Sequence, residues 1–278
     1  MSSSRALLLT IALVGCRGEE VVPTGADSAT SETAASDSAN SETGGVDAND
    51  AGDAGDAVVA GCARAHGPKM VRIDATAASY CIDTTEVSVG HFNEFLSASA
   101  YDAPAFCKSF ADARPPRNDT AAEQALPVRS VQWCWAQAYC KWAGKRLCGK
   151  IGSSGYDVPS DGRGEWTYAC QNGKLATRYP YGATYIESTC NTAPGTLQSV
   201  GANKDCHGQG TPFDQVSDML GNVGEIEGGV GFLTTGEPSS ARGRGYAHGD
   251  GAHDCLDLAD FAFTATYPQL GFRCCADP

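Results

Sequence analysis

Apolar side chains recur at helical spacing along residues 89–98, and this pattern predicts an amphipathic helix. Ser88 comes directly before it and can cap the first turn, because a serine hydroxyl accepts a hydrogen bond from an unpaired backbone N–H. The apolar face consists of Val89, Phe92, Phe95 and Leu96. One face of this helix is therefore expected to pack against a core.

A second helix is predicted to begin after Ser130, which would be its cap, and to end before Gly144. Lys145 and Arg146 follow the glycine, where positive charge favours the negative end of a helix. The predicted buried stripe consists of Val131, Trp135, Ala138, Tyr139 and Trp142.

The remaining pattern predicts a short third helix and few strands. The helix is expected to start near Ser160 and to end before Gly173, and it carries Trp166, Ala169 and Cys170. Short strands are expected over 70–73, 80–83, 242–246 and 270–275. Residues 172–251 are rich in Gly, Thr, Pro and Asn, with only brief apolar runs. Early helices followed by long irregular loops predict an α+β fold of low regularity.

The first residues indicate export. Arg5 precedes an apolar run over 6–14, which is shorter than the roughly 20 residues that cross a bilayer as a helix. The run is typical of a secretory signal peptide. It ends in Leu-Val-Gly-Cys at 13–16, which resembles a bacterial lipobox, so residues 1–15 are predicted to be removed and Cys16 to carry lipid. The alternative is an ordinary cleaved signal with an incidental cysteine.

Residues 16–60 are predicted to form a disordered acidic tether. From Arg17 to Ala60 the chain has ten carboxylates against one arginine and no aromatic residue, so it cannot bury enough surface to fold. Most of the net charge of −13 lies here, and no basic stripe points to nucleic acid. The expected partner is a membrane, reached through the lipid. Arg17 does not resemble the Asp that retains some lipoproteins in an inner membrane, so the outer membrane or cell surface is expected.

Residues 61–278 are long enough for one domain and contain twelve of the thirteen cysteines. An even number of cysteines in an exported domain predicts about six disulfides. A zinc site is less favoured, because the sequence has no C-x-x-C pair. Cys274 and Cys275 are neighbours, so on a strand they point to opposite faces and should bond different partners. The disulfide candidates are Cys62, Cys81, Cys107, Cys134, Cys140, Cys148, Cys170, Cys190, Cys206, Cys255, Cys274 and Cys275.

Seven blocks follow one another between Cys81 and Cys274. They read CIDTTEV (81–87), PVRSVQW continuing to AYCKWAGKRL (127–147), EWTYA (165–169), YPYG (179–182), DMLGNVGE (218–225), RGRGY (242–246) and GFRC (271–274). In this order they resemble the formylglycine-generating-enzyme, or sulfatase-modifying-factor, family. The resemblance implies that family's C-type-lectin-like α+β fold.

The resemblance also implies an activity, the oxidation of a protein cysteine to formylglycine with copper held by two thiolates. Carried over from the block at 242–246, the two thiolate positions hold His248 and His253 here, and the nearby cysteine is Cys255. One thiolate cannot form a two-sulfur site for a soft metal. Copper and catalysis of the family kind are therefore not expected.

A calcium site is the other feature that the resemblance implies. Its ligands would be Asp218, the carbonyls of Gly221 and Val223, and Glu225. Hard oxygen donors with two carboxylates suit Ca²⁺. The alternative is a solvated turn with a capping aspartate. A second family loop would place Asn191 and Thr192, with other ligands around Asp205, near another ion.

His248, Asp250 and His253 form a further candidate group. Imidazole nitrogens with this spacing can bind zinc, iron or copper. The alternative is a glycine-rich solvent loop with incidental polar residues.

Two functions follow from these observations. The first is a non-catalytic binding or structural module of the cell envelope, which keeps the fold and binds an unknown protein or glycan through residues 224–253. The alternative is a metal-dependent oxidase of the formylglycine-generating type that uses His248, His253 or Cys255. The sequence contains no G-x-S-x-G, Walker or H-E-x-x-H motif.

Overall fold

The computed structural model describes the residues that make up the folded domain. These are 61–98, 107, 115, 117–153, 163–174, 177–192, 195–229, 239–246, 253–262 and 264–278. All of them belong to one unit of the chain, Ala54–Pro278. No helix within the described ranges is both long and apolar enough to span a bilayer. The predicted signal peptide, the lipidated Cys16 and the tether lie outside the described residues and stay predictions.

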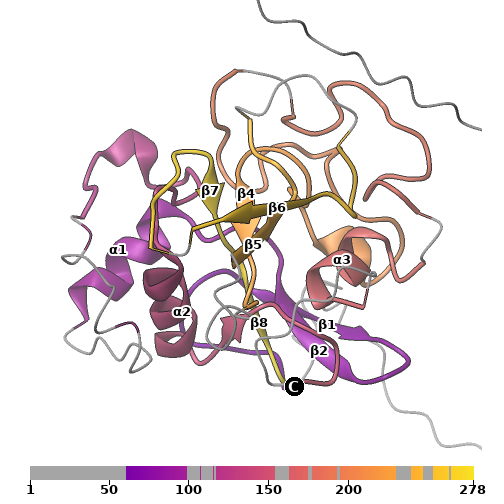
Figure 1. The fold of residues 1–278 in the computed structure, drawn as a ribbon, viewed down its shortest axis with the longest axis horizontal. Coiled ribbons are helices and arrows are strands. Elements are labelled where there is room, and N and C mark those ends of the chain that lie inside the picture. Colours follow the sequence, from indigo (N-terminus) through magenta and orange to yellow (C-terminus); the bar gives the residue numbers. More distant parts are fainter. Residues whose placement is uncertain are drawn as a thin grey trace, which may run out of the picture. The chain divides into compact units, whose positions relative to one another are not determined.

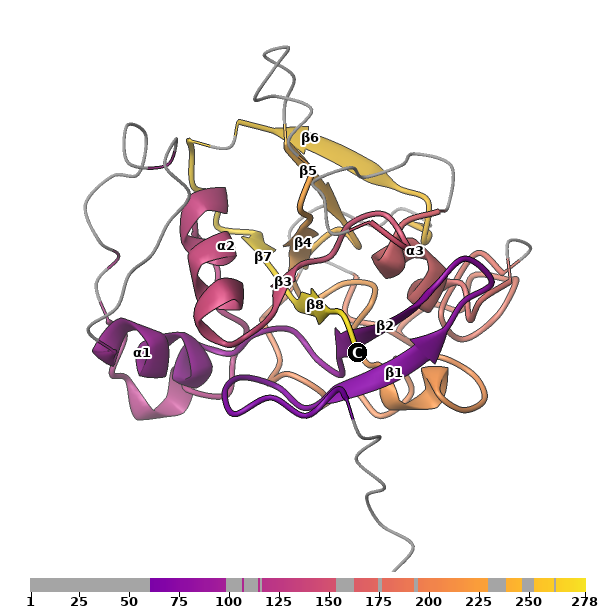
Figure 2. The same cartoon turned by 90° about the horizontal axis from the view of Figure 1, so that it is seen from below.

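The first of two small sheets joins both ends of the domain. Its strand order is β1 (Met70–Asp74), β2 (Ser79–Asp83), β8 (Cys274–Ala276), β3 (Arg146–Leu147). All neighbours are antiparallel. Cys275 lies opposite Ile82 on one side and Arg146 on the other, so the last strand fills the gap between β2 and β3 (Figure 2).

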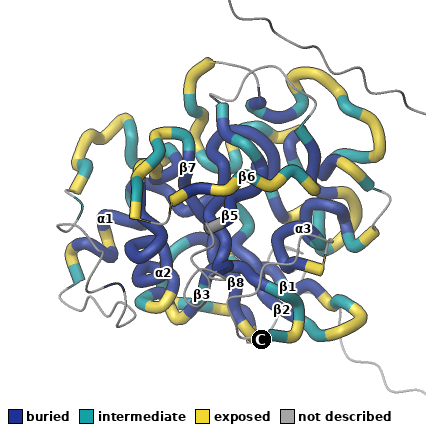
Figure 3. Tube along the Cα trace, in the orientation of Figure 1, coloured by how far each residue is buried: buried dark blue, intermediate teal, exposed yellow. Residues whose placement is uncertain are grey.

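The second sheet has the strand order β6 (Leu258–Phe261), β5 (Ser239–Arg242), β4 (Gly224–Ile226), β7 (Leu270–Gly271). It combines two strands near predicted ones, β5 and β7, with two that the sequence did not predict, β4 and β6. The β4–β7 pair is parallel and the other two pairs are antiparallel. The chain around β4, β7 and β8 is buried, whereas the surrounding loops are largely exposed (Figure 3).

Two helices pack together on one side of the sheets, and a third lies on the other side (Figure 1). They are α1 (Val89–Ser97), α2 (Trp133–Trp142) and α3 (Glu165–Cys170), and the short 3₁₀ turns are η2 (Ala121–Glu123) and η3 (Phe213–Gln215). Phe95 of α1 contacts Tyr139 and Trp142 of α2, with ring centroids 5.7 and 5.5 Å apart. The predicted cap of α1 is confirmed, because the Ser88 hydroxyl accepts the His91 N–H at 3.2 Å.

The predicted start of the second helix is wrong. Ser130 has φ of +57° and donates its backbone N–H to the carbonyls of Tyr267 and Leu270, which ties it to the segment before β7. Gln132 becomes the N-cap instead, and α2 begins at Trp133. The expected end is confirmed, with Gly144 at φ of +71° after the helix.

Lys145 and Arg146 follow the end of α2, and each also forms an ion pair with a distant carboxylate. Lys145 is buried, and its Nζ lies 2.6 Å from the carboxylate of Asp83. Arg146 binds Glu165 through two hydrogen bonds of 2.6 Å each. Lys145 therefore links the chain just after α2 to β2, and Arg146 links β3 to α3.

Two predicted strands need correction. β5 ends at Arg242 rather than continuing to residue 246, because the chain turns where Arg244 has φ of +36°. The stretch 270–275 forms two strands in different sheets, β7 and β8, separated by Phe272 and Arg273. The third helix begins at Glu165, and the predicted start near Ser160 lies outside the described residues.

Two large apolar clusters fill most of the interior, and a small third one surrounds Cys62, Cys81 and Ala276. One joins α1 and α2 to the second sheet and includes Trp133, Tyr139 and Phe272. The other includes Tyr80 of β2, Trp166 of α3 and several disulfides. The low-regularity α+β class predicted from the sequence is confirmed.

The predicted framework of six disulfides is also confirmed. The bonds are Cys62–Cys81, Cys107–Cys134, Cys140–Cys274, Cys148–Cys275, Cys170–Cys255 and Cys190–Cys206. The neighbours on β8 bond different partners, as the alternation of side chains on a strand requires. Two of the bonds therefore anchor β8, one to α2 and one to the segment after β3.

Candidate functional site

The segment 218–225 bends sharply before it enters β4. Asp218, Gly221 and Asn222 have φ of +56°, +79° and +55°. At Gly221 a Cβ would lie 2.4 Å from the carbonyl carbon and oxygen of Asn191, so only glycine fits. The bend lets both ends of the segment, Asp218 and Glu225, approach Arg273.

Three buried carboxylates gather around Arg273. Glu225 accepts hydrogen bonds of 2.6 Å from Nε and Nη2 of Arg273. Glu86 accepts the Val223 N–H at 3.1 Å, and Asp218 accepts the Gly201 N–H at 2.5 Å. The side chains of Glu86, Asp218 and Glu225 are at most 4% exposed. We call Glu86, Asp218 and Glu225 the buried acidic group.

The electrostatics of the buried acidic group favour a cation. Burial raises the pKa of Glu86 well above its usual value, and the charges of Asp218 and Glu225 raise it further. Burial likewise raises the pKa of Asp218, with a smaller contribution from Glu225. Three carboxylates thus share the guanidinium of Arg273, and hard oxygens with surplus negative charge suit Ca²⁺.

The donor set limits how a cation could bind. Glu225 Oε2 accepts hydrogen bonds from Arg273 Nε and from Trp166 Nε1, the second at 2.8 Å. Its Oε1 accepts one hydrogen bond, from Arg273 Nη2, so Oε1 has more capacity left for a cation. The residues that could hold calcium are Asp218, through its second oxygen, and Glu225, through Oε1. They are the two side chains that the sequence predicted as ligands.

The second predicted calcium loop abuts the first. The carbonyl of Asn191 accepts the Asn222 N–H at 2.9 Å, which joins this loop to the first. The disulfide Cys190–Cys206 links the segment of Asn191 to the segment that contains Asp205. Thr192 is buried, whereas Asp205 is exposed. A ligand set around Asp205 stays a prediction.

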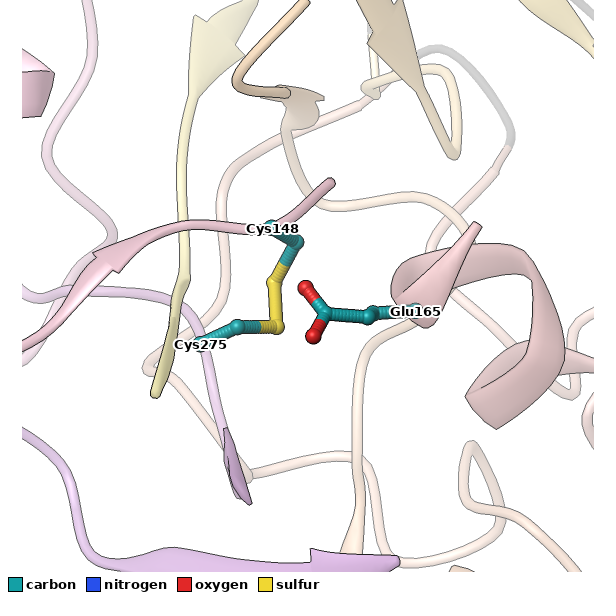
Figure 4. Close-up of side chains that lie close together, drawn as sticks. All are labelled: Cys148, Glu165 and Cys275. Atoms are coloured by element: carbon teal, nitrogen blue, oxygen red, sulfur yellow. A yellow bond between two sulfur atoms is a disulfide. The ribbon is translucent and has the colours of Figure 1, made fainter. Parts of the chain in front are cut away.

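Two further glutamate–arginine pairs line the interior beside this region. Glu227 binds Arg242 at 2.7 Å through Oε2, while its Oε1 is buried without a hydrogen bond. Burial raises the pKa of Glu227 to about 7, against the opposing charge of Arg242. The carboxylate of Glu165 lies beside a disulfide (Figure 4). It is already bound by Arg146 and the Gly149 N–H, which makes it a structural anchor.

Every cysteine from Cys62 to Cys275 is in a disulfide. Cys255 bonds Cys170, so it offers no free thiolate beside the loop where the resemblance placed the copper ligands. The sulfur atoms of Cys148 and Cys275 near Glu165 are bonded to each other. Oxidised in this way, none of these sulfurs is a thiolate ligand.

His253 is held at the beginning of the segment that leads to β6. Its Nδ1 lies 2.8 Å from a carboxylate oxygen of Asp257, and its Nε2 is buried without a partner. His248 and Asp250, the other members of the predicted group, lie outside the described residues.

Sequence reasoning missed three residues of these sites. Glu86 and Arg273 join the buried acidic group from distant blocks, and only their place in those blocks could have drawn attention to them. Asp257, four residues after His253, is at a spacing that permits contact across one turn. None of the three carries a motif of its own.

A separate cavity of about 290 Å³ lies against α1. Among the described residues it is lined by Val89, Phe92 and Asn93 and by the segment 126–131. Asn93 is engaged by Asn118 and Gln124. The lining includes no member of the buried acidic group and not His253.

The fold and the buried acidic group define a disulfide-rich α+β domain of low regularity. The family described as "Sulfatase-modifying factor enzyme 1-like domain" matches residues 54–278, which is most of the chain, and the chain belongs to this family. Its fold is the formylglycine-generating-enzyme-like fold that the sequence blocks predicted. The buried acidic group and β4 lie within the matched range.

The family assignment is accompanied by a curated relative. A protein named formylglycine-generating enzyme from Streptomyces coelicolor is 32% identical over 94 residues, which cover 33% of this chain and 26% of that protein. The match therefore spans about a quarter of the relative's length.

Solved structures with a similar fold are the crystal structure of CarF, Treponema denticola variable protein 1 and PvdO from Pseudomonas aeruginosa. Their identities to this chain are 16%, 16% and 18%, and their TM-scores are 0.45, 0.47 and 0.44. The matches cover 72%, 75% and 72% of this chain, and 87%, 95% and 81% of those chains.

Proposed function

We propose that this protein is an exported, lipid-anchored member of the family that acts as a non-catalytic binding or structural module of the cell envelope. The observation that carries the proposal is the state of its cysteines. All twelve from Cys62 to Cys275 are paired, and the two positions that the resemblance assigns to copper thiolates hold histidine. Within the described domain, no pair of free thiolates is left for a soft two-sulfur copper site.

An oxidation assay tests whether the protein lacks formylglycine-generating activity. Full-length protein, a cysteine-containing peptide and copper(I) are mixed under air, and the peptide mass is followed. The expected result is no conversion of cysteine to formylglycine. Turnover that disappears in Cys255→Ser would contradict the proposal, and non-reducing peptide mapping of the same sample shows whether Cys255 and Cys170 remain bonded.

The module is proposed to bind its partner through residues 224–253, a protein or a glycan of the envelope. The rigid side of this segment is β4 and β5, which are paired to each other and to β6 and β7. Rigid strands beside variable loops are a common basis for recognition. A glycan array and a cross-linking screen on intact cells would separate the two partner classes.

Anchoring is proposed to depend on Cys16. In Cys16→Ser the lipid cannot attach, so the protein should move from the membrane fraction to the soluble exported fraction. Fractionation with immunoblotting measures this shift. An unchanged membrane fraction would mean that the signal is of another kind.

Calcium binding to the buried acidic group is proposed on the surplus of three carboxylates over one guanidinium. Added Ca²⁺ should raise the melting temperature, because an ion that binds only the folded state stabilises it. The rise should disappear in Asp218→Asn and Glu225→Gln. Glu225→Gln also breaks the pair with Arg273, so the calcium-dependent change is the relevant readout, and Mg²⁺ is the control ion.

The alternative function, a metal-dependent oxidase, keeps one favourable observation, the unpartnered Nε2 of His253. It requires oxygen consumption that depends on added metal and stops in His253→Gln. The two functions therefore differ in the oxygen-uptake assay.

A further inference from the structure

The cavity against α1 has an apolar lining that two chain segments supply. Val89 and Phe92 belong to α1, and Leu126 and Val128 belong to the segment that precedes α2. Backbone hydrogen bonds of 2.8 Å from Val89 to Leu126 and of 2.9 Å from Val128 to Val87 fix the two segments against each other. The volume of about 290 Å³ lies at the lower end of the range for small-molecule sites.

Several polar side chains of the cavity already bind one another. Asn93 Nδ2 donates to the Asn118 carbonyl and to Gln124 Oε1, and Asn93 Oδ1 accepts the Asn118 N–H at 3.1 Å. Glu123 accepts a hydrogen bond from the Asn118 side chain. The charge of Glu123 repels anions, so an anionic group would have to bind at another part of the lining.

Arg129 and Ser130 supply donors at such a part of the lining. Within the described ranges, neither the Arg129 guanidinium nor the Ser130 hydroxyl has a hydrogen-bond or ion-pair partner. Ser130 has φ of +57°, a sparsely populated conformation for a residue other than glycine, and its N–H bonds to the carbonyls of Tyr267 and Leu270 keep it there. Strain that is maintained in this way is typical of ligand-binding positions.

We propose that this cavity binds a small carboxylate with an apolar body, in which the carboxylate pairs with Arg129 and the body packs on Val89 and Phe92. A planar guanidinium matches a carboxylate through two parallel hydrogen bonds, and the Ser130 hydroxyl can donate a third. At about 30 Å³ per non-hydrogen atom the volume holds about ten such atoms, the size of octanoate. The occupant is therefore a free small molecule.

The inference goes beyond the proposed function. The described lining of the cavity shares no residue with the segment 224–253 or with the buried acidic group. Binding of a carboxylate here and binding of an envelope partner there are separate events.

The test uses the full-length chain carrying Cys16→Ser, so that neither attached lipid nor detergent competes. Isothermal titration with octanoate should show one saturable site. Octanol lacks the charge, octylammonium reverses it, and acetate lacks the apolar body, so each should bind at least about 10-fold more weakly.

Two substitutions test the proposed donors. Arg129→Gln should weaken octanoate binding at least about 10-fold, and Ser130→Gly, which tolerates the same backbone conformation without the hydroxyl, about 3-fold. Arg117→Gln is the matched control, because Arg117 is an exposed arginine that pairs with Asp119 and does not line the cavity. It should leave octanoate binding unchanged.

A photoreactive octanoate analogue with a diazirine in its chain locates the site. After irradiation, the label should lie on peptides that contain residues 89–93 or 126–131.

The proposal is overturned if octanoate binding does not saturate, if octanol or octylammonium binds as tightly, if Arg129→Gln binds as well as wild type, or if the label lies elsewhere. Melting curves establish that each variant is folded. The ligand series on the unsubstituted domain is decisive by itself, so an unfolded variant does not rescue the idea. The glycan array and the cross-linking screen do not depend on this cavity, so either proposal can fail alone.

Discussion

Lys145 and Asp83 form an ion pair whose side chains are both fully buried. Lys145 also donates to the carbonyl of Pro68, and Asp83 accepts the Cys274 N–H at 2.9 Å. The pair thus joins the end of α2, the β2 strand and the start of β8. Burial nevertheless raises the pKa of Asp83 to about 6, against the charge of Lys145.

The raised pKa of Asp83 makes stability depend on pH. The folded protein holds this proton more tightly than the unfolded chain, so the free energy of unfolding contributed by Asp83 falls as pH rises from about 4 to above 6. The loss is at most about 3 kcal/mol. Asp83→Asn cannot titrate, so denaturation of both proteins across this range should show wild type losing stability relative to the variant. A difference that grows in favour of wild type would mean that Lys145 controls the pair.

Gly221 offers a second prediction at the scale of one residue. Gly221→Ala should destabilise the fold by more than about 2 kcal/mol, because its Cβ would overlap the backbone of Asn191 in addition to the strain of a positive φ. Gly210 is a matched control, with φ of +73° and no atom within 4 Å of the position that a Cβ would take. Gly210→Ala should cost only about 1 kcal/mol. Equal losses in urea denaturation would show that strain alone matters.

Among the elements, α1 was predictable and α2 only in part. The apolar face of α1 and its serine cap are local features, and the structure places both as expected. The start of α2 depends instead on Ser130 reaching the carbonyls of Tyr267 and Leu270, contacts that no local pattern contains. The strands β4 and β6 were missed for the same reason, since they are short and defined by their neighbours.

The cap of α1 should be measurable. Ser88→Ala removes the hydroxyl that accepts the His91 N–H, so the free energy of unfolding should fall by about 1 kcal/mol. Ser88→Thr keeps a hydroxyl at this position and should lose less. Chemical denaturation of the three proteins provides the comparison. A loss of equal size in both variants would indicate that packing around Ser88, rather than the cap, is responsible.

At the scale of the whole molecule, the buried acidic group shows what sequence reasoning can reach. Asp218 and Glu225 were identified because they share one block. Glu86, however, contacts Asn222 across 136 residues of chain, and no spacing rule connects them. The number of disulfides followed from an even cysteine count, whereas their connectivity required the three-dimensional arrangement.

Cys148–Cys275 and Cys190–Cys206 should stabilise the fold by similar amounts, although their cysteines are 127 and 16 residues apart. Because Cys140–Cys274 already joins almost the same two points, the loop that Cys148–Cys275 closes in the otherwise oxidised chain is only about 9 residues, eight from 140 to 148 and one from 274 to 275. Chain entropy then assigns about 3 kcal/mol to each bond. Removing either pair as alanines should therefore cost about 3 kcal/mol in urea denaturation. A much larger loss for the Cys148–Cys275 pair would show that native-state packing outweighs the entropy of the unfolded chain.

The position of β8 between β2 and β3 also determines the order in which the disulfides can form. During synthesis, Cys62 can find Cys81 soon after both emerge, because they are 19 residues apart. Cys140 and Cys148 must wait for the final residues before their partners exist, and meanwhile each is free to react wrongly with the other. Maturation of this protein should therefore pass through misbonded species, and an isomerase that reshuffles them should accelerate its appearance more than an oxidant alone.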